Sequence, residues 1–165
     1  MDRAAGPSRC RSREFDTPEM TRYFTLQQAE RLLPEVESAI REAIALKAEH
    51  LKAEEELHSS MQRVMMLGGV DLDRKAFLEQ RARREGSALR LKEVIERIHE
   101  FGCLVKDLDI GLIDFPTLLR GQEVYLCWKL GETGIAFWHH VEDGFKGRQP
   151  IDREFLDNHE GELPN

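Results

Sequence analysis

The sequence lacks any apolar run close to the roughly 20 residues that a helix needs to cross a bilayer. Its arginine-containing N-terminus also lacks the apolar segment of a secretory signal. Cysteine is scarce as well: Cys10, Cys103 and Cys127 are an odd number and cannot all pair within the chain. We therefore expect a cytoplasmic protein in which Cys103 and Cys127 are free thiols.

Basic charge is also in short supply. The chain has 24 Lys and Arg against 31 Asp and Glu, which gives a net charge of −7. Non-specific nucleic-acid binding and docking on anionic lipid both draw their affinity from clustered cations. We therefore expect neither a nucleic acid nor a membrane among the partners.

The two ends differ from the middle in composition. Residues 1–19 hold arginines among Gly, Pro and Ser without a periodic apolar pattern, which is typical of a disordered arm. Met20 stands directly before the first structured-looking segment, so the arm is also explained by an over-long start-site assignment. Residues 20–151 are expected to form a single domain, which the length of the chain fits. Residues 152–165 are expected to be a loosely held acidic tail, apart from a contact of Phe155 and Leu156.

The first helix signals follow the arm directly. Thr25 and Gln28 match a capping box, in which each side chain bonds the backbone of the other residue. Pro34 is expected to end or kink the helix that this box opens, because proline lacks an N–H and clashes with the preceding turn. The domain is thus predicted to begin with a kinked helix.

A long helical hairpin is predicted over residues 35–101. The glycine pair Gly68-Gly69 stops its first helix, and Asp71 or Asp73 caps the second. Each helix would be roughly 45–50 Å long at about 1.5 Å per residue, whereas a compact domain of this size is about 30 Å wide. Because the loop is short, the helices return antiparallel and project as a coiled-coil-like hairpin.

The register of this hairpin follows from its turn. If the turn centres on Val70, facing charges meet, namely Glu54, Glu55 and Glu56 against Arg81, Arg83 and Arg84. The apolar seam is uneven, with Lys47 and His50 near its middle. A weak seam in a long hairpin favours a second subunit that covers it. We therefore expect a homodimer, and the hairpin is also the expected surface for another protein partner.

After Cys103 the pattern changes to strands. Residues 103–108, 123–130 and 135–141 are predicted strands, and the turn-rich stretch 111–122 separates the first two. The fold class is therefore α+β, with a small C-terminal antiparallel β module over residues 103–150 packed at the base of the hairpin.

The last two strands are predicted to form a β-hairpin around the four residues 131–134. This loop length places Trp128 opposite Phe137 and Leu126 opposite His139. Cys127 then lies on the other face, which it shares with His140. A slip of one residue would reverse the assignment of faces.

Three segments together resemble a known family: YFTLQQAERLLPEV at 23–36, GLIDFP at 111–116 and YLCWKLGETGIAFWHHVEDGFKGRQP at 125–150. In this combination and order they resemble the uncharacterised bacterial family called domain of unknown function 2203. The resemblance covers roughly residues 22–151. It implies a start near Met20 and a helical hairpin followed by a small β-containing region. It supplies no activity, substrate or cofactor.

The densest polar and aromatic set lies in the β region and makes a candidate ligand-binding site, with Trp128, Glu132, Trp138, His139, Asp143, Phe145 and Arg148. His139 suits a general base, because its unperturbed pKa lies near neutrality. The competing interpretation, which we favour, makes the aromatic residues core and His139 a hydrogen-bonded core histidine. Arg148 then ties down the last loop by pairing with Asp143 or Glu142.

Metal binding is a weaker hypothesis. Cys103, Cys127, His139 and His140 carry atoms that zinc prefers, but no CxxC or HxxxH pair anchors them. In the predicted register His140 is the better companion for Cys127. We therefore predict no metal and no cofactor, with Cys127 and His140 as weak candidates.

Two Glu-x-x-His motifs on the helices, Glu55/His58 and Glu96/His99, match the ligand arrangement of di-iron bundles. The hairpin register separates their histidines by roughly 25 Å along the helices, so one chain cannot form a shared site from them.

No catalytic set converges in the sequence. The first hypothesis is therefore a non-catalytic, dimeric interaction or scaffold protein. The alternative is a small-ligand-binding protein or enzyme whose site lies around Trp128, His139 and Arg148.

Overall fold

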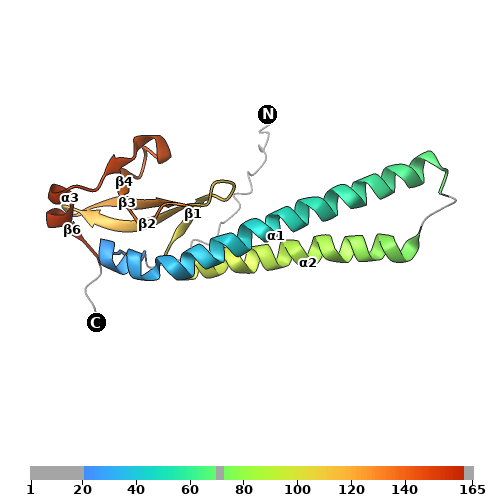
Figure 1. Ribbon diagram of the computed structural model, residues 1–165, viewed down its shortest axis with the longest axis horizontal. Coiled ribbons are helices and arrows are strands. Elements are labelled where there is room, and N and C mark those ends of the chain that lie inside the picture. Colours follow the sequence, from blue (N-terminus) through green and yellow to red (C-terminus); the bar gives the residue numbers. More distant parts are fainter. Residues whose placement is uncertain (1–20, 70–72, 162–165) are drawn as a thin grey trace, which may run out of the picture.

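A computed structural model describes residues 21–69 and 73–161 of the chain (Figure 1). A long antiparallel helical hairpin projects beyond a small antiparallel sheet that packs at its base, so the α+β prediction is confirmed. The predicted arm over residues 1–19 lies outside the described residues. Within the described part, none of the helices is both long and apolar enough to span a membrane.

The first helix, α1, is longer than the sequence suggested. It runs from Leu26 to Met66, and the predicted capping box is present: the Thr25 hydroxyl accepts from the Gln28 N–H (3.2 Å), and the Gln28 side chain accepts from the Thr25 N–H (2.8 Å). The helix does not end at Pro34, which lies inside it. Proline removes one backbone bond there, but the neighbouring Leu33 and Val36 are buried in the core, and their packing keeps the chain helical.

The turn of the hairpin has the predicted chemistry. Gly68 and Gly69 adopt φ values of 65° and 79°, in the region that favours glycine. The Asp73 side chain caps α2 (Arg74–Glu100) by accepting from the Ala76 N–H at 3.1 Å. Asp71, the other predicted cap, lies outside the described residues.

The predicted helix register is confirmed by cross-helix ion pairs. Glu56 contacts Arg83 at 3.0 Å, and Glu42 contacts Arg97 at 2.7 Å. The seam is uneven, as expected: apolar side chains fill its base, while in the middle His50 Nδ1 lies 3.0 Å from the Arg84 carbonyl oxygen.

The sheet contains a strand where the sequence suggested only turns. It has the order β1 (Leu104–Asp107), β2 (Leu112–Leu119), β3 (Gln122–Lys129), β4 (Phe137–His140) and β5 (Gln149–Pro150). Thus the stretch 111–122 holds a central strand. Residues 112–117 are all buried, so they show no alternation of polar and apolar positions. A tight turn at Arg120 and Gly121, both with positive φ, connects β2 to β3.

The predicted register between β3 and β4 is wrong by one residue. Tyr125 lies opposite His139, and Cys127 lies opposite Phe137. The connection between the strands spans residues 130–136 instead of 131–134, because the Leu130 N–H bonds the Gly111 carbonyl and Ile135 is buried. In consequence Cys127 and His139 share a face of the sheet.

The segment predicted to be a loose tail is part of the fold. After the 3₁₀ turn η1 (Phe145–Gly147) and β5, the chain forms α3 (Arg153–Asn158) and β6 (His159–Glu160), and β6 pairs with β2. The Phe155 ring is 2% exposed, and its centroid lies 5.1 Å from the rings of both Trp138 and His159. Only residues 162–165 of that segment lie outside the described part.

Candidate functional site

The two faces of the sheet have different chemistry. Ile113, Trp128 and Trp138 belong to the core that includes Val36 and Ile40 of α1, so their face is covered by the helix. Side chains alternate along a strand. Asp114, Cys127 and His139 therefore lie on the opposite face.

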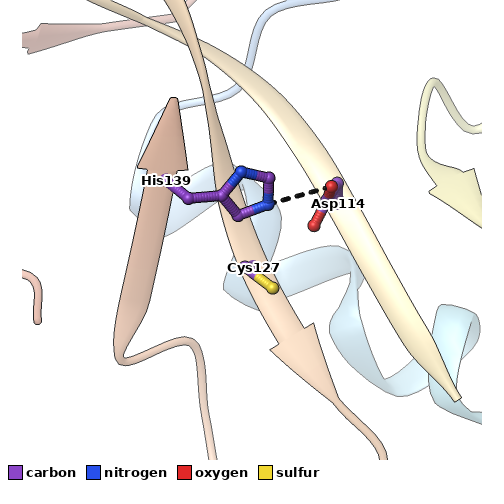
Figure 2. A group of neighbouring side chains, drawn as sticks. All are labelled: Asp114, Cys127 and His139. Carbon is purple, nitrogen blue, oxygen red and sulfur yellow. Dashed lines mark hydrogen bonds and ion pairs between the residues drawn. The ribbon is translucent and has the colours of Figure 1, made fainter. Parts of the chain in front are cut away.

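On that opposite face three metal-ligating side chain types converge from three neighbouring strands: Asp114 from β2, Cys127 from β3 and His139 from β4 (Figure 2). One ligand atom of each residue lies within 4.8 Å of those of the other two. All three residues are at most 1% exposed. A buried polar cluster of this kind must satisfy its hydrogen bonds internally or hold a ligand.

The histidine of this cluster is fixed by two hydrogen bonds. His139 Nδ1 lies 2.7 Å from the His140 carbonyl oxygen, and Nε2 lies 3.1 Å from Asp114 Oδ2. A carbonyl oxygen only accepts, so Nδ1 carries a hydrogen. Nε2 and the carboxyl then share one proton, which leaves the Asp114–His139 pair neutral overall.

Burial shifts the acidic groups of the cluster toward their neutral forms. It raises the pKa of the Asp114 carboxyl, against the opposing effect of His139. Burial, with a smaller contribution from the nearby Asp114, raises the pKa of the Cys127 thiol to about 12. The thiol is therefore protonated at neutral pH and is not poised as a nucleophile.

One oxygen atom of the cluster lacks a regular hydrogen bond. Asp114 Oδ1 is buried and has no partner that meets ordinary hydrogen-bond geometry, although the Cys127 thiol lies close enough to influence the pKa of the carboxyl. Buried acceptors without a partner are rare in folded proteins.

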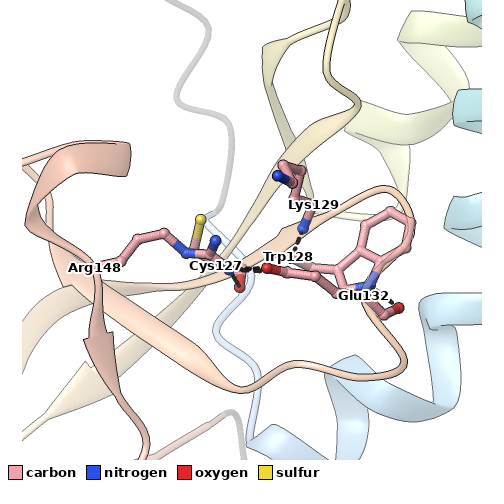
Figure 3. A network of polar contacts seen from close by, with 5 residues as sticks. All are labelled: Cys127, Trp128, Lys129, Glu132 and Arg148. Carbon is pink, nitrogen blue, oxygen red and sulfur yellow. Dashed lines mark hydrogen bonds and ion pairs between the residues drawn. The ribbon is translucent and has the colours of Figure 1, made fainter.

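A second polar network surrounds Arg148 (Figure 3). The Arg148 guanidinium donates to both carboxylate oxygens of Glu132 at 2.8 Å and to the Cys127 carbonyl at 3.3 Å. Glu132 also accepts from the Lys129 N–H at 2.8 Å. The guanidinium stacks over Phe137, 4.1 Å from the ring centroid. Arg148 does tie down the last loop, but its partner is Glu132 and not Asp143 or Glu142.

The seven predicted ligand-binding residues do not converge on one site. Trp128 and Trp138 lie on the α1 side of the sheet, while His139 lies on the other side with Asp114. Glu132, Phe145 and Arg148 are close together, and Phe145 is 40% exposed, so it is not core. Asp143 is exposed in the turn after β4.

The weak metal candidate His140 is also displaced. Its ring packs against Trp138, with centroids 5.1 Å apart, so it does not accompany Cys127. The companions of Cys127 are His139 and Asp114. Asp114 was missed because its segment was interpreted as a turn. An aspartate inside the apolar run LIDFP was the available signal.

The family comparison covers the whole site. The sequence profile of a family described as "uncharacterized conserved protein (DUF2203)" matches residues 22–151. The match extends from just before α1 through β5, and it includes Asp114, Cys127, His139 and Arg148. No curated protein and no solved structure matches the chain.

Proposed function

The chain belongs to the DUF2203 family of uncharacterized conserved proteins, and we propose that it works as a non-catalytic interaction protein that dimerises through its helical hairpin. The observation that carries this proposal is the apolar surface on the outer part of the hairpin. Five large apolar side chains are exposed there, namely Met61, Met65, Met66, Leu67 and Leu78, and two more, Leu51 and Leu89, are exposed in the middle of the hairpin.

These side chains contrast with those at the base of the same helices. Met65 and Met66 are 81% and 87% exposed, whereas Val36 and Ile40 are fully buried. Groups of large apolar side chains exposed in one region mark interaction surfaces in soluble proteins. Methionine in particular adapts its flexible side chain to a partner.

A second copy of the chain is the occupant that we propose for this surface. Two hairpins laid side by side form a four-helix bundle, which covers the faces that a lone pair of helices leaves open. A two-fold arrangement uses the same patch on both chains, so the assembly closes. The charged residues beside the patch, such as Lys75 and Glu79, carry both signs, which keeps self-association free of strong repulsion.

The geometry gives less support to the alternative of a ligand site around Trp128, His139 and Arg148. Trp128 is fully buried on the α1 side of the sheet, so a small ligand cannot contact both Trp128 and His139. Arg148 is engaged by Glu132. We also propose a reducing, cytoplasmic location, because both cysteines in the described part of the chain are buried free thiols.

The test is the oligomeric state of the full chain. Multi-angle light scattering of the wild-type protein at micromolar concentration is expected to give the mass of a dimer. Met65→Glu and Leu78→Glu place charges in the apolar patch and are expected to give the monomer mass, because burying an unpaired charge is costly.

Lys52→Gln is the matched control, because it also makes the net charge more negative by one, at an exposed polar position of α1 that lies well before Met61 along the helix. It is expected to remain dimeric. A wild-type monomer over the whole concentration range, or equal dissociation of all three variants, contradicts the proposal.

A further inference from the structure

The Asp114–Cys127–His139 cluster offers three donor atoms of the types that bind divalent transition metals: a carboxylate oxygen, a sulfur and an imidazole nitrogen. They come from adjacent strands, with Asp114 directly opposite Cys127 in the β2–β3 register. A tetrahedral zinc site with metal–ligand distances of about 2.0–2.3 Å places its donor atoms roughly 3.5 Å apart. Since these donors lie within 4.8 Å of one another, side-chain adjustment of about an ångström closes the site.

The carboxylate supplies the observation that points to a ligand. Asp114 is 0% exposed, and its Oδ1 has no partner at ordinary hydrogen-bond geometry, although the weakly donating Cys127 thiol lowers the pKa of the carboxyl. The carboxylate oxygens lie on the side facing the His139 ring and the Cys127 sulfur (Figure 2). A buried lone pair that is left without a strong donor is costly, and a cation at this point removes the cost.

The histidine is already oriented for coordination. Its Nδ1–H donates to the His140 carbonyl, which fixes the ring and directs Nε2 at the cluster. Histidines that bind metals characteristically donate their second nitrogen to a carbonyl or carboxylate in this way.

The charges of the donors are balanced by a divalent ion. Without metal, the donor atoms of the cluster hold two protons, one shared by Asp114 and His139 and one on the thiol, and the cluster is neutral. A divalent ion that displaces both protons binds to one carboxylate, one thiolate and one neutral imidazole, which again sum to zero. A net charge in a buried site is strongly unfavourable, so a divalent ion that displaces both protons is compatible with the burial of these donors.

From this geometry we propose that Asp114, Cys127 and His139 bind one divalent transition-metal ion, of which Zn²⁺ is the representative, with water as the fourth ligand. Binding releases two protons for each ion: the shared carboxyl–imidazole proton and the thiol proton both go to solvent. No electron is transferred. The sulfur and nitrogen donors favour Zn²⁺ and Co²⁺ over Mg²⁺ and Ca²⁺, which prefer oxygen.

The test uses the full chain, stripped of metal with a chelator and then titrated with Co²⁺. We expect an absorption spectrum with a thiolate-to-cobalt charge-transfer band and the intense visible bands of tetrahedral cobalt. Saturation is expected at one ion for each chain, with reversal by Zn²⁺ and no response to Mg²⁺. A pH indicator in weak buffer is expected to report two protons for each bound ion.

Matched variants identify the ligands. Cys127→Ser is expected to abolish the charge-transfer band, and Asp114→Asn to weaken binding more than about tenfold. Cys103→Ala removes the other buried thiol of the described chain, outside the cluster, and should leave the spectrum unchanged. Circular dichroism checks that each variant is folded.

The wild-type titration stands even if a variant does not fold. A wild-type protein that shows no charge-transfer band at saturating Co²⁺, or that releases no protons, overturns the proposal. Loss of the band in Cys103→Ala with its retention in Cys127→Ser overturns the assignment of ligands. Light scattering reports on dimerisation independently of this result.

Discussion

The base and the outer part of the hairpin are made from the same two helices but differ in what holds them. At the base, Val36 and Ile40 of α1 pack with Ile98 of α2 and with the sheet. Beyond Leu57, the described part of α1 has no further buried apolar residue, and on α2 the outermost buried residue is Ser87, which bonds back to its own helix. The comparison shows that the outer turns of both helices add exposed surface and bury almost no apolar side chains.

The largest expected effect on the free energy of unfolding comes from a substitution at the base of the hairpin. Ile40→Ala removes a fully buried side chain and is expected to cost about 2–5 kcal/mol of unfolding free energy, through lost burial and the cavity left behind. Met66→Ala, at an 87% exposed position, is expected to change it by less than ~0.5 kcal/mol in dilute protein. Urea denaturation followed by circular dichroism measures both. Similar changes in the free energy of unfolding for the two substitutions would contradict the proposed difference between the base and the outer part of the hairpin.

The sheet module can be tested in the same way through its ion pairs. The Arg148 and Glu132 side chains are 11% and 23% exposed, so Arg148→Gln leaves a partly buried carboxylate unpaired and is expected to cost about 2 kcal/mol. The control is Arg153→Gln, because the Arg153 side chain is 95% exposed and lies 3.9 Å from Asp157. That change is expected to cost less than ~0.5 kcal/mol. Equal shifts of the urea midpoint would show that the Arg148 pair is no stronger than a surface pair.

The base also contains a buried thiol that makes stability depend on alkaline pH. Burial raises the pKa of Cys103 from 9.0 to about 12. Between these values the folded chain keeps a proton that the unfolded chain has lost, so stability is full below about pH 9 and falls as the pH rises. One such group contributes a loss of about 1.4 kcal/mol for each pH unit.

Comparison with Cys103→Ala isolates this contribution. The variant is less stable at neutral pH, because it loses buried volume, but its stability is expected to fall less steeply above pH 9. Urea titrations at several alkaline pH values measure the two slopes, and equal slopes rule out the contribution of Cys103.

The sequence predictions succeeded where the structure depends on neighbouring residues and failed where it depends on residues far apart in the chain. The capping box at Thr25, the glycine turn and the Asp73 cap depend on residues within one helical turn of each other, and the Glu56–Arg83 contact follows once the turn is placed. The helix does not stop at Pro34, because Leu33 and Val36 beside it are buried in the core. The local sequence does not reveal that packing.

The sheet was harder to predict because small local ambiguities reverse its faces. The glycines at 131 and 134 indicate a four-residue turn, yet the contact of Leu130 with Gly111 widens the connection and slips the register by one residue. That slip moved His139 to the face of Cys127. Asp114 was missed because β2 is buried on both faces and gives no alternating pattern. The candidate metal site therefore became visible only in three dimensions.

The smallest expected effect tests whether the outer hairpin is a separate unit of stability. Gly86 lies inside α2, and a methyl group there would meet no atom within 4 Å. Alanine is better than glycine in a helix by about 1 kcal/mol, so Gly86→Ala is expected to stabilise α2. Gly69→Ala is the opposite case: φ of 79° strains alanine by about 1 kcal/mol although the space is open.

Hydrogen exchange distinguishes where each change acts. Because the outer part has little buried apolar contact, it should open without unfolding the base. Gly86→Ala is therefore expected to slow amide exchange in residues 74–90 about fivefold, and Gly69→Ala to speed it, with little change in residues 91–100. Equal changes along all of α2 would mean that the hairpin opens as one unit with the core. The base and the outer part of the hairpin would then differ in the exposure of their side chains but not in their local stability.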